Sequence, residues 1–294
     1  MESPQSKACV RASCIMELSM TNTATVHAEE VSSHERFEFG RNWANFLETL
    51  DEGRIEQAEQ SLQDMLGTSD LHGKDFLDAG SGSGLFSLAA RRLGARVYSF
   101  DYDPQSVKCT AELRARYFEN DTLWRVEQAS VLDPGYLQGL GQFDIVYSWG
   151  VLHHTGAMWQ ALANVAPLVR PGGQLFVAIY NDQGKTSRRW TLVKRTYNQF
   201  PPALRFMVLL PAFLNLWWRR LLKDLLTGHP TKSFSTYRRS RGMSPWHDVV
   251  DWVGGYPFEV ARPEQIFNFY RDRGFTLQRL RTEGGDLGCN EFVF

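Results

Sequence analysis

Apolar residues follow two alternating patterns along the chain. Short, nearly continuous apolar runs are typical of buried parallel strands, and they stand at 75–79, 95–101, 123–128, 143–149 and 171–182. Between these runs apolar residues recur every three or four positions, which predicts helices. Two last runs, 275–280 and 289–294, are joined by a glycine-rich turn that suits an antiparallel pair. The pattern predicts an α/β protein with a doubly wound, seven-stranded, mostly parallel sheet whose last strand is antiparallel.

The same pattern divides the chain into four segments. Residues 1–33 are rich in Ser, Thr, Ala and Glu without a sustained period, which predicts a disordered extension. Residues 34–182 begin with two helical repeats and continue as the strand–helix core. Residues 183–261 break the core pattern and form a basic, aromatic, helical insertion. Residues 262–294 supply a helix starting at Pro263 and the final strand pair.

The turn after the first strand carries the clearest chemical signal. Asp78 is followed by glycines at 80, 82 and 84, and an apolar helical repeat begins at once. A dinucleotide-binding turn needs a glycine or alanine where this chain has Leu85, and no Gly-Lys-Ser/Thr phosphate loop follows. A carboxylate two residues before the first glycine suits a cationic ligand better than pyrophosphate. The turn therefore predicts a site for a nucleotide-like ligand with positive charge.

The Asp-x-Gly-x-Gly-x-Gly turn resembles the cofactor loop of class I S-adenosylmethionine (SAM)-dependent methyltransferases. The segment from Phe143 to His154, ending in Val-Leu-His-His, resembles small-molecule members of that family. The resemblance covers about 70–182 and 262–294. It implies a Rossmann-like fold, SAM as the cofactor and methyl transfer as the activity.

Further residues are expected to contact the cofactor. Asp101 ends the second strand 21 residues beyond Gly80, where a carboxylate is placed to accept hydrogen bonds from ribose hydroxyls. The alternative for Asp101 is a helix cap, a role that Asp103 can fill. Related enzymes carry an acid where this chain has Ser130, so we expect the Ser130 hydroxyl or nearby backbone groups to bind adenine. The expected cofactor-binding residues are Asp78, Gly80, Ser81, Gly82, Asp101, Tyr102, Ser130, Val131 and Trp149.

Methyl transfer from a sulfonium mainly requires orientation, but an amine or hydroxyl acceptor must also lose a proton. His153 and His154 are the candidates for that step, with Tyr180 or His247 as second choices. The alternative for the histidine pair is capping or packing at a helix entrance. Arg41 and Trp43 are further candidates for the pocket wall, and core packing is the competing role of Trp43.

Bulk properties exclude several classes of protein. The formal net charge is −1, so overall charge does not indicate a nucleic-acid-binding or membrane-binding protein. The four cysteines form no Cys-x-x-Cys pair and no zinc-type cluster, so no metal site is expected. No signal-peptide core and no run of 18 apolar residues occurs, which favours a cytoplasmic setting.

The insertion differs from the rest in charge. Residues 183–241 hold 13 Lys and Arg but one acid, Asp224, which suggests an anionic partner. Three interpretations stay open: a helical lid that shapes the acceptor pocket, an interfacial helix giving peripheral membrane contact through 204–226, and a nucleic-acid surface.

The predicted function is SAM-dependent methylation of an oxygen or nitrogen on a small or lipid-like, anionic acceptor. A nucleic-acid methyltransferase and a non-catalytic SAM-binding protein are the alternatives. The sequence does not indicate an oligomeric state.

Overall fold

A seven-stranded sheet forms the centre of the molecule. The computed structural model describes residues 23–229, 233, 245–284 and 287–294. The strand order is β3-β2-β1-β4-β5-β7-β6, with β7 antiparallel to both neighbours and the first five strands parallel. The strands are β1 Asp75–Ala79, β2 Arg96–Asp101, β3 Trp124–Gln128, β4 Phe143–Trp149, β5 Val169–Tyr180, β6 Arg279–Arg281 and β7 Cys289–Val293. The predicted fold class is confirmed.

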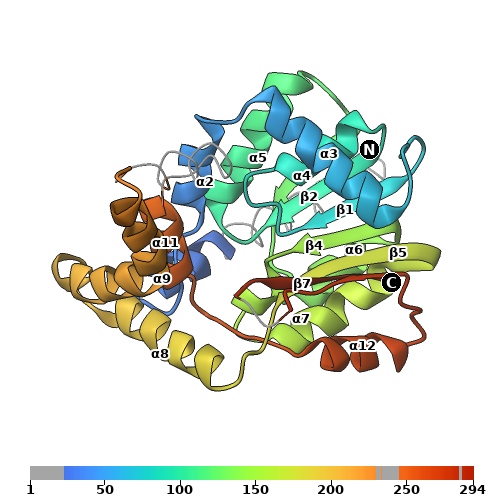
Figure 1. Cartoon of the computed structure of the whole chain (residues 1–294). Helices are drawn as coiled ribbons and strands as arrows, with labels where there is room; N and C mark the ends of the chain where they lie inside the picture. Colours follow the sequence, from blue (N-terminus) through green and yellow to red (C-terminus); the bar gives the residue numbers. More distant parts are fainter. Residues whose placement is uncertain (1–22, 230–232, 234–244, 285–286) are drawn as a thin grey trace.

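Helices cover both faces of this sheet (Figure 1). One core cluster joins the sheet to α2 Gly40–Leu47, α3 Glu52–Leu66, α4 Leu85–Arg92 and α5 Pro104–Tyr117. The other joins it to α6 Pro134–Leu140, α7 Met158–Val165 and α12 Pro263–Arg271. Asp103 and Asp133 cap α5 and α6, as the Asp-Pro pairs in the sequence suggest.

Two predicted boundaries differ from the structure by more than two residues. Residues 23–32 are helical, and His27 is buried there, so the expected disorder does not extend through residue 33. Residues 1–22 lie outside the described part. The sixth strand begins at Arg279 rather than Phe275, because the Phe275 N–H still bonds to Tyr270 at the end of α12 and the Phe275 and Leu277 side chains pack on the core.

The insertion forms a helical unit with a small core of its own. It holds α8 Lys185–Gln199, α9 Phe206–Leu226 and α11 Pro245–Gly254. Trp190 and Tyr197 of α8, Trp217 of α9 and Val253 of α11 are buried together. Phe37 and Tyr180 of the sheet domain pack against this cluster. Within the described ranges, none of the helices combines the length and the apolar character needed to cross a bilayer.

Candidate functional site

A cavity of about 480 Å³ opens beyond the carboxyl ends of β1, β2 and β4. Its volume lies in the range of small-molecule sites, and its position is where open α/β sheets bind ligands. All nine residues expected to bind the cofactor line it. The glycine loop (78–84), the tip of β2 and the segment after β3 thus meet at one place, although they are far apart in the chain.

The glycine loop brings bare backbone to the cavity wall. Gly80 has φ 90° and Gly82 has φ 55°, a region that residues with a side chain rarely adopt. A Cβ on Gly80 would lie 2.3 Å from Cγ1 of Val151. One on Gly82 would lie 3.2 Å from the ring of Trp43, which also lines the cavity. The loop leaves its backbone open to close contact with a ligand.

Asp78 places a buried carboxylate at the base of this loop. Only 2% of the residue is exposed, and the Ser87 hydroxyl donates a 2.5 Å hydrogen bond to its Oδ2. Burial raises the pKa of its carboxyl to about 7, against the lowering effect of the Ser87 bond. A cation bound in the cavity would stabilise the ionised form, so the site is better suited to a cationic than to an anionic ligand.

Asp101 has a structural partner that the sequence did not reveal. Its Oδ2 accepts the Gly82 N–H at 2.8 Å, and its Oδ1 accepts the Asp103 N–H at 2.9 Å. Burial raises its pKa to about 6, while these backbone bonds oppose the shift. Asp101 therefore fixes the glycine loop against the tip of β2. The expected contact with ribose remains a prediction.

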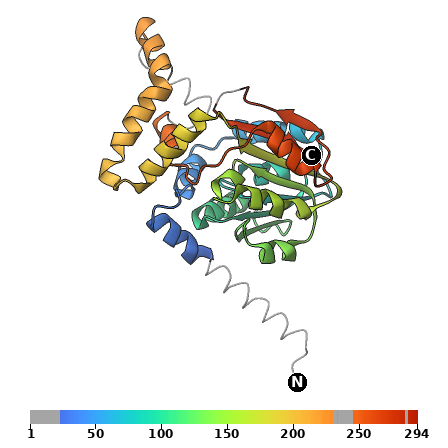
Figure 2. The ribbon, with the colours of Figure 1, turned by 90° about the horizontal axis from the view of Figure 1, so that it is seen from below.

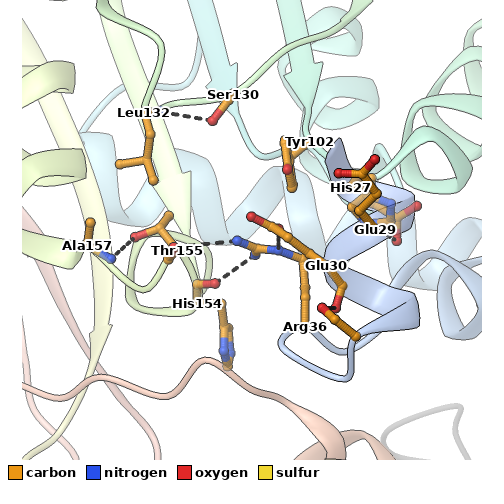
Figure 3. Close-up of polar contacts among 12 residues, drawn as sticks. His27, Glu29, Glu30, Arg36, Tyr102, Ser130, Leu132, His154, Thr155 and Ala157 are labelled. Carbon is orange, nitrogen blue, oxygen red and sulfur yellow. Dashed lines mark hydrogen bonds and ion pairs between the residues drawn. The ribbon is translucent and has the colours of Figure 1, made fainter. Parts of the chain in front are cut away.

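The helix over 23–32 and the segment after it cover one side of the cavity (Figure 3). Arg36 bonds to Glu30 at 2.6 Å and to the carbonyl of His154 at 2.9 Å, with a further bond to Thr155. Its guanidinium lies 4.8 Å from the centre of the Tyr102 ring. Arg36 thereby joins the N-terminal segment to the loop after β4.

His27 is a cavity residue that sequence reasoning missed. It is 5% exposed, and its Nε2 is a buried atom without a hydrogen-bond partner among the described residues. Oδ2 of Asp103 lies 3.9 Å away, and the Tyr102 ring is 5.2 Å from the His27 ring. Burial lowers the pKa of His27, opposed by Asp103. Nothing in the weakly periodic sequence around His27 signals this role.

The far side of the cavity is mostly apolar. Val131 and Leu132 line it, and Ser130 Oγ accepts the Leu132 N–H at 3.1 Å in a tight local turn (Figure 3). Trp149 is 42% exposed and donates its Nε1–H to Glu291 at 2.9 Å. Trp43 lines the cavity and also packs against the core, so both roles foreseen for it occur together.

The Arg41 and His247 side chains lie outside what the structure describes.

The two adjacent histidines have different surroundings. His154 lines the cavity and donates its Nδ1–H to the Pro257 carbonyl at 2.6 Å, which leaves Nε2 as the acceptor in the neutral ring. Burial, followed by the nearby Lys194, lowers its pKa to about 3. His153 is fully buried, accepts the Tyr180 N–H at Nδ1, and has no hydrogen-bond partner at Nε2 among the described residues. Burial also lowers the pKa of His153.

Tyr180 stands behind the histidine pair. Its ring centre is 4.0 Å from that of His153 and 5.3 Å from that of Trp252 in the insertion. Among the described residues the cavity wall includes His154 but neither His153 nor Tyr180. Of the candidates for proton transfer whose side chains the structure describes, His154 is thus the one in direct reach of a bound ligand.

Comparison with known proteins agrees with this geometry. Residues 77–175 match a family model described as a methyltransferase domain. The match covers β1, the glycine loop, β2 to β4 and the start of β5. The family resemblance inferred from the sequence is confirmed.

Proteins similar to part of this chain include ubiquinone biosynthesis O-methyltransferases. The protein of Caulobacter vibrioides is 34% identical over 111 residues, which are 38% of this chain and 42% of the relative. That of Xanthomonas euvesicatoria is 33% identical over 135 residues, 46% of this chain and 52% of the relative. The chain thus spans about half the length, or less, of these relatives. A solved magnesium protoporphyrin IX methyltransferase from Synechocystis has a TM-score of 0.49 at 15% identity, covering 82% of each chain.

Proposed function

We propose that the protein is a SAM-dependent methyltransferase that acts on an oxygen or nitrogen of a small-molecule acceptor. The observation that carries the proposal is the cavity in which a buried carboxylate, Asp78, lies beside an open glycine loop. SAM has an ammonium and a sulfonium, which fit the acid-lined base, and an adenosine, which fits the apolar far side. When bound, it supplies a methyl group already activated on sulfur.

The residues around the cavity divide into three groups in this proposal, one for each part of SAM. Asp78 and the backbone of Gly80 to Gly82 hold the methionine part. Asp101 and Tyr102 contact the ribose, and the turn from Ser130 to Leu132 holds the adenine. The Nε2 of His27, which has no hydrogen-bond partner among the described residues, adds a polar contact on the covered side of the cavity. These assignments follow from position and burial, and each can be tested separately.

His154 is the candidate that orients the acceptor. Its Nδ1–H is engaged by Pro257, so Nε2 is left to accept a hydrogen bond from an acceptor hydroxyl or amine. With a pKa of about 3 the ring stays neutral at physiological pH and is a weak base. We therefore propose that His154 mainly aligns the reacting atom, while the proton leaves to solvent. His153 and Tyr180 support the His154 ring by packing against it.

Oxygen is the favoured acceptor atom, because the curated relatives named above are O-methyltransferases. Their involvement in ubiquinone biosynthesis, together with the apolar cavity wall, favours a lipid-like acceptor over nucleic acid. A non-catalytic SAM-binding protein is the alternative, and it would bind SAM without turnover.

Calorimetric titration with SAM tests the proposal first. We expect binding of SAM and no comparable binding of ATP, whose phosphates would meet Asp78. Absence of binding at millimolar SAM would contradict the proposal. Incubation with methyl-labelled SAM and fractionated cell extract then identifies the acceptor. The His154→Ala variant should bind SAM normally but transfer label slowly, and equal transfer would remove His154 from the mechanism.

A further inference from the structure

Helix α9 exposes a continuous apolar stripe. Met207, Leu210, Leu214, Trp218, Leu222 and Leu225 recur at intervals of three and four residues, so they lie along one face of the helix. Each is between 45% and 71% exposed. We call these six residues the α9 stripe. A stripe of large apolar side chains this long marks an interaction surface, whereas single exposed residues do not.

The opposite face holds α9 in place. Leu209, Ala212 and Trp217 are buried in the small core shared with α8 and α11. Phe213 stacks on Trp217, with 5.9 Å between ring centres. Figure 2 shows α9, in orange, projecting away from the sheet domain. The helix is therefore anchored to the insertion on one side and presents the stripe outward on the other.

The exposed polar surface of α8 and α9 is basic. Residues 185–226 hold nine Lys and Arg, of which Lys194 is buried, against one acid, Asp224. Asp224 is buried and accepts two bonds from Ser233, so it does not offset the surface charge. Arg219, Arg220 and Lys223 are exposed, and the Arg219 guanidinium lies 5.4 Å from the centre of the Trp218 ring. An apolar face with Trp and Leu, combined with Lys and Arg on the polar face of the same helix, is typical of helices that lie in a membrane interface.

These features favour one partner over the others. A second copy would bring two strongly basic surfaces together, which like-charge repulsion opposes. Single-stranded nucleic acid is bound by stacking on aromatic rings, whereas five of the six stripe residues are Leu or Met. Aliphatic side chains gain most from contact with acyl chains, and the arginines match anionic headgroups.

We propose that the α9 stripe docks on an anionic phospholipid surface, with its apolar side chains in the headgroup–acyl boundary and Arg219, Arg220 and Lys223 at headgroup level. Docking itself does not depend on methyl transfer. Its consequence does rest on the function proposed above: α9 belongs to the helical unit that packs on Tyr180, so a membrane-borne acceptor would be delivered close to His154.

Vesicle flotation tests the proposal with the full chain. The probe is phosphatidylcholine vesicles with about one third phosphatidylglycerol, compared with phosphatidylcholine alone. We expect the wild type to float with the anionic vesicles and to be released by high salt. The Leu210→Glu/Leu214→Glu variant should reduce the bound fraction about tenfold, and Arg219→Gln/Arg220→Gln should weaken binding and its salt dependence. Leu123→Glu, at an exposed leucine before β3, is the matched control and should float like the wild type.

Thermal unfolding and sedimentation of each variant complete the design. Equal melting temperatures show that the substitutions act on the surface and not on folding. Failure of the wild type to float, or equal flotation of the stripe variant, overturns the proposal. A wild-type dimer that becomes monomeric in the stripe variant, without vesicle binding, assigns the stripe to a second copy instead. Because flotation needs no SAM, its result is independent of the cofactor tests.

Discussion

The cavity and the insertion lie at the same end of the sheet but are built in opposite ways. The acidic residues of the cavity face inward: Asp78 and Asp101 are surrounded by protein, and burial raises the pKa of both carboxyl groups. The basic residues of the insertion include exposed side chains on α9, the helix that carries the α9 stripe. A buried acid selects a small cation that can enter the cavity. Exposed basic residues instead attract an anionic surface that is too large to enter any cavity.

The contacts between the two regions show how they can work together. Asn42 of α2 donates to Asp251 of α11 at 2.7 Å, and the Pro257 carbonyl at the end of the insertion holds the ring of His154. Among the described residues, the insertion thus touches the His154 side of the cavity, whereas the contacts of the glycine loop come from the sheet domain. We expect changes in the glycine loop to abolish cofactor binding, and changes in the insertion to spare it.

The largest effect is expected from Gly80→Ala. Its Cβ would meet Val151 at 2.3 Å at a φ of 90°, so the loop must shift away from the geometry that exposes its backbone. SAM affinity should fall more than about 1,000-fold, or about 4 kcal/mol, measured by calorimetry. Gly139→Ala is the matched control, because a Cβ there meets nothing within 4 Å. Affinity of Gly80→Ala within tenfold of wild type would contradict the assignment of the loop.

The second largest effect is expected in the pH dependence of SAM affinity. A cation prefers the ionised Asp78, and because the pKa of this carboxyl is about 7, it must release a proton before binding at lower pH. Affinity should therefore rise with pH and level off above pH 7, with a gain of about 30- to 100-fold between about pH 5 and about pH 8. Asp78→Asn should bind more weakly and show a much flatter profile. An unchanged slope in Asp78→Asn would assign the titration to another group.

Much of the cavity was predictable because its residues follow strand ends. Parallel strands bring their carboxyl ends to one edge, so Asp78, Asp101 and Ser130 could be placed together from the strand pattern alone. The covering segment with His27 and Arg36 could not be placed in this way. It follows no strand, and its position depends on tertiary bonds such as that from Arg36 to the His154 carbonyl.

The histidine pair shows a second limit of sequence reasoning. The Val-Leu-His-His motif placed both rings near the cavity, but it did not tell which one faces the ligand. That depends on the short 3₁₀ turn Leu152–His154, which directs His154 to the cavity wall and buries His153 against Tyr180. Likewise, the apolar run of α9 did not reveal which of its faces is buried, because nearly every position of its first half is apolar.

Asp101→Asn should have an intermediate effect of about tenfold on SAM affinity. The amide keeps the shape of the side chain but has one acceptor oxygen for the N–H groups of Gly82 and Asp103, and it would present an N–H to one of them. The loop should loosen without losing its backbone geometry. Competition between SAM and a 2′-deoxyribose analogue refines the test. If Asp101 contacts the ribose, the analogue loses affinity in the wild type but little more in the variant.

The smallest effect is expected from Lys194→Met in the insertion. Lys194 is fully buried, bonds to the Trp252 carbonyl and lies 4.1 Å from the centre of the Trp252 ring. Methionine fills a similar volume and removes a buried charge, but it leaves that carbonyl without its donor. These effects oppose each other, so the free energy of unfolding at pH 7 should change by less than about 1 kcal/mol. SAM affinity should stay within about twofold, since Lys194 lies outside the cavity wall.

At alkaline pH the stabilities of the wild type and of Lys194→Met are expected to differ. Burial lowers the pKa of Lys194 from 10.5 to about 7, with Asp251 opposing the shift. Between these two pH values Lys194 is protonated in the unfolded chain but neutral in the folded chain. The free energy of unfolding of the wild type therefore rises with pH, by up to about 1.4 kcal/mol per pH unit, and the variant does not show this rise. Urea unfolding at several pH values measures this gain, and Lys185→Met, at an exposed position of α8, is the control. A tenfold loss of SAM affinity in Lys194→Met would instead show that the insertion shapes the cofactor site, and the two regions could no longer be treated as separate.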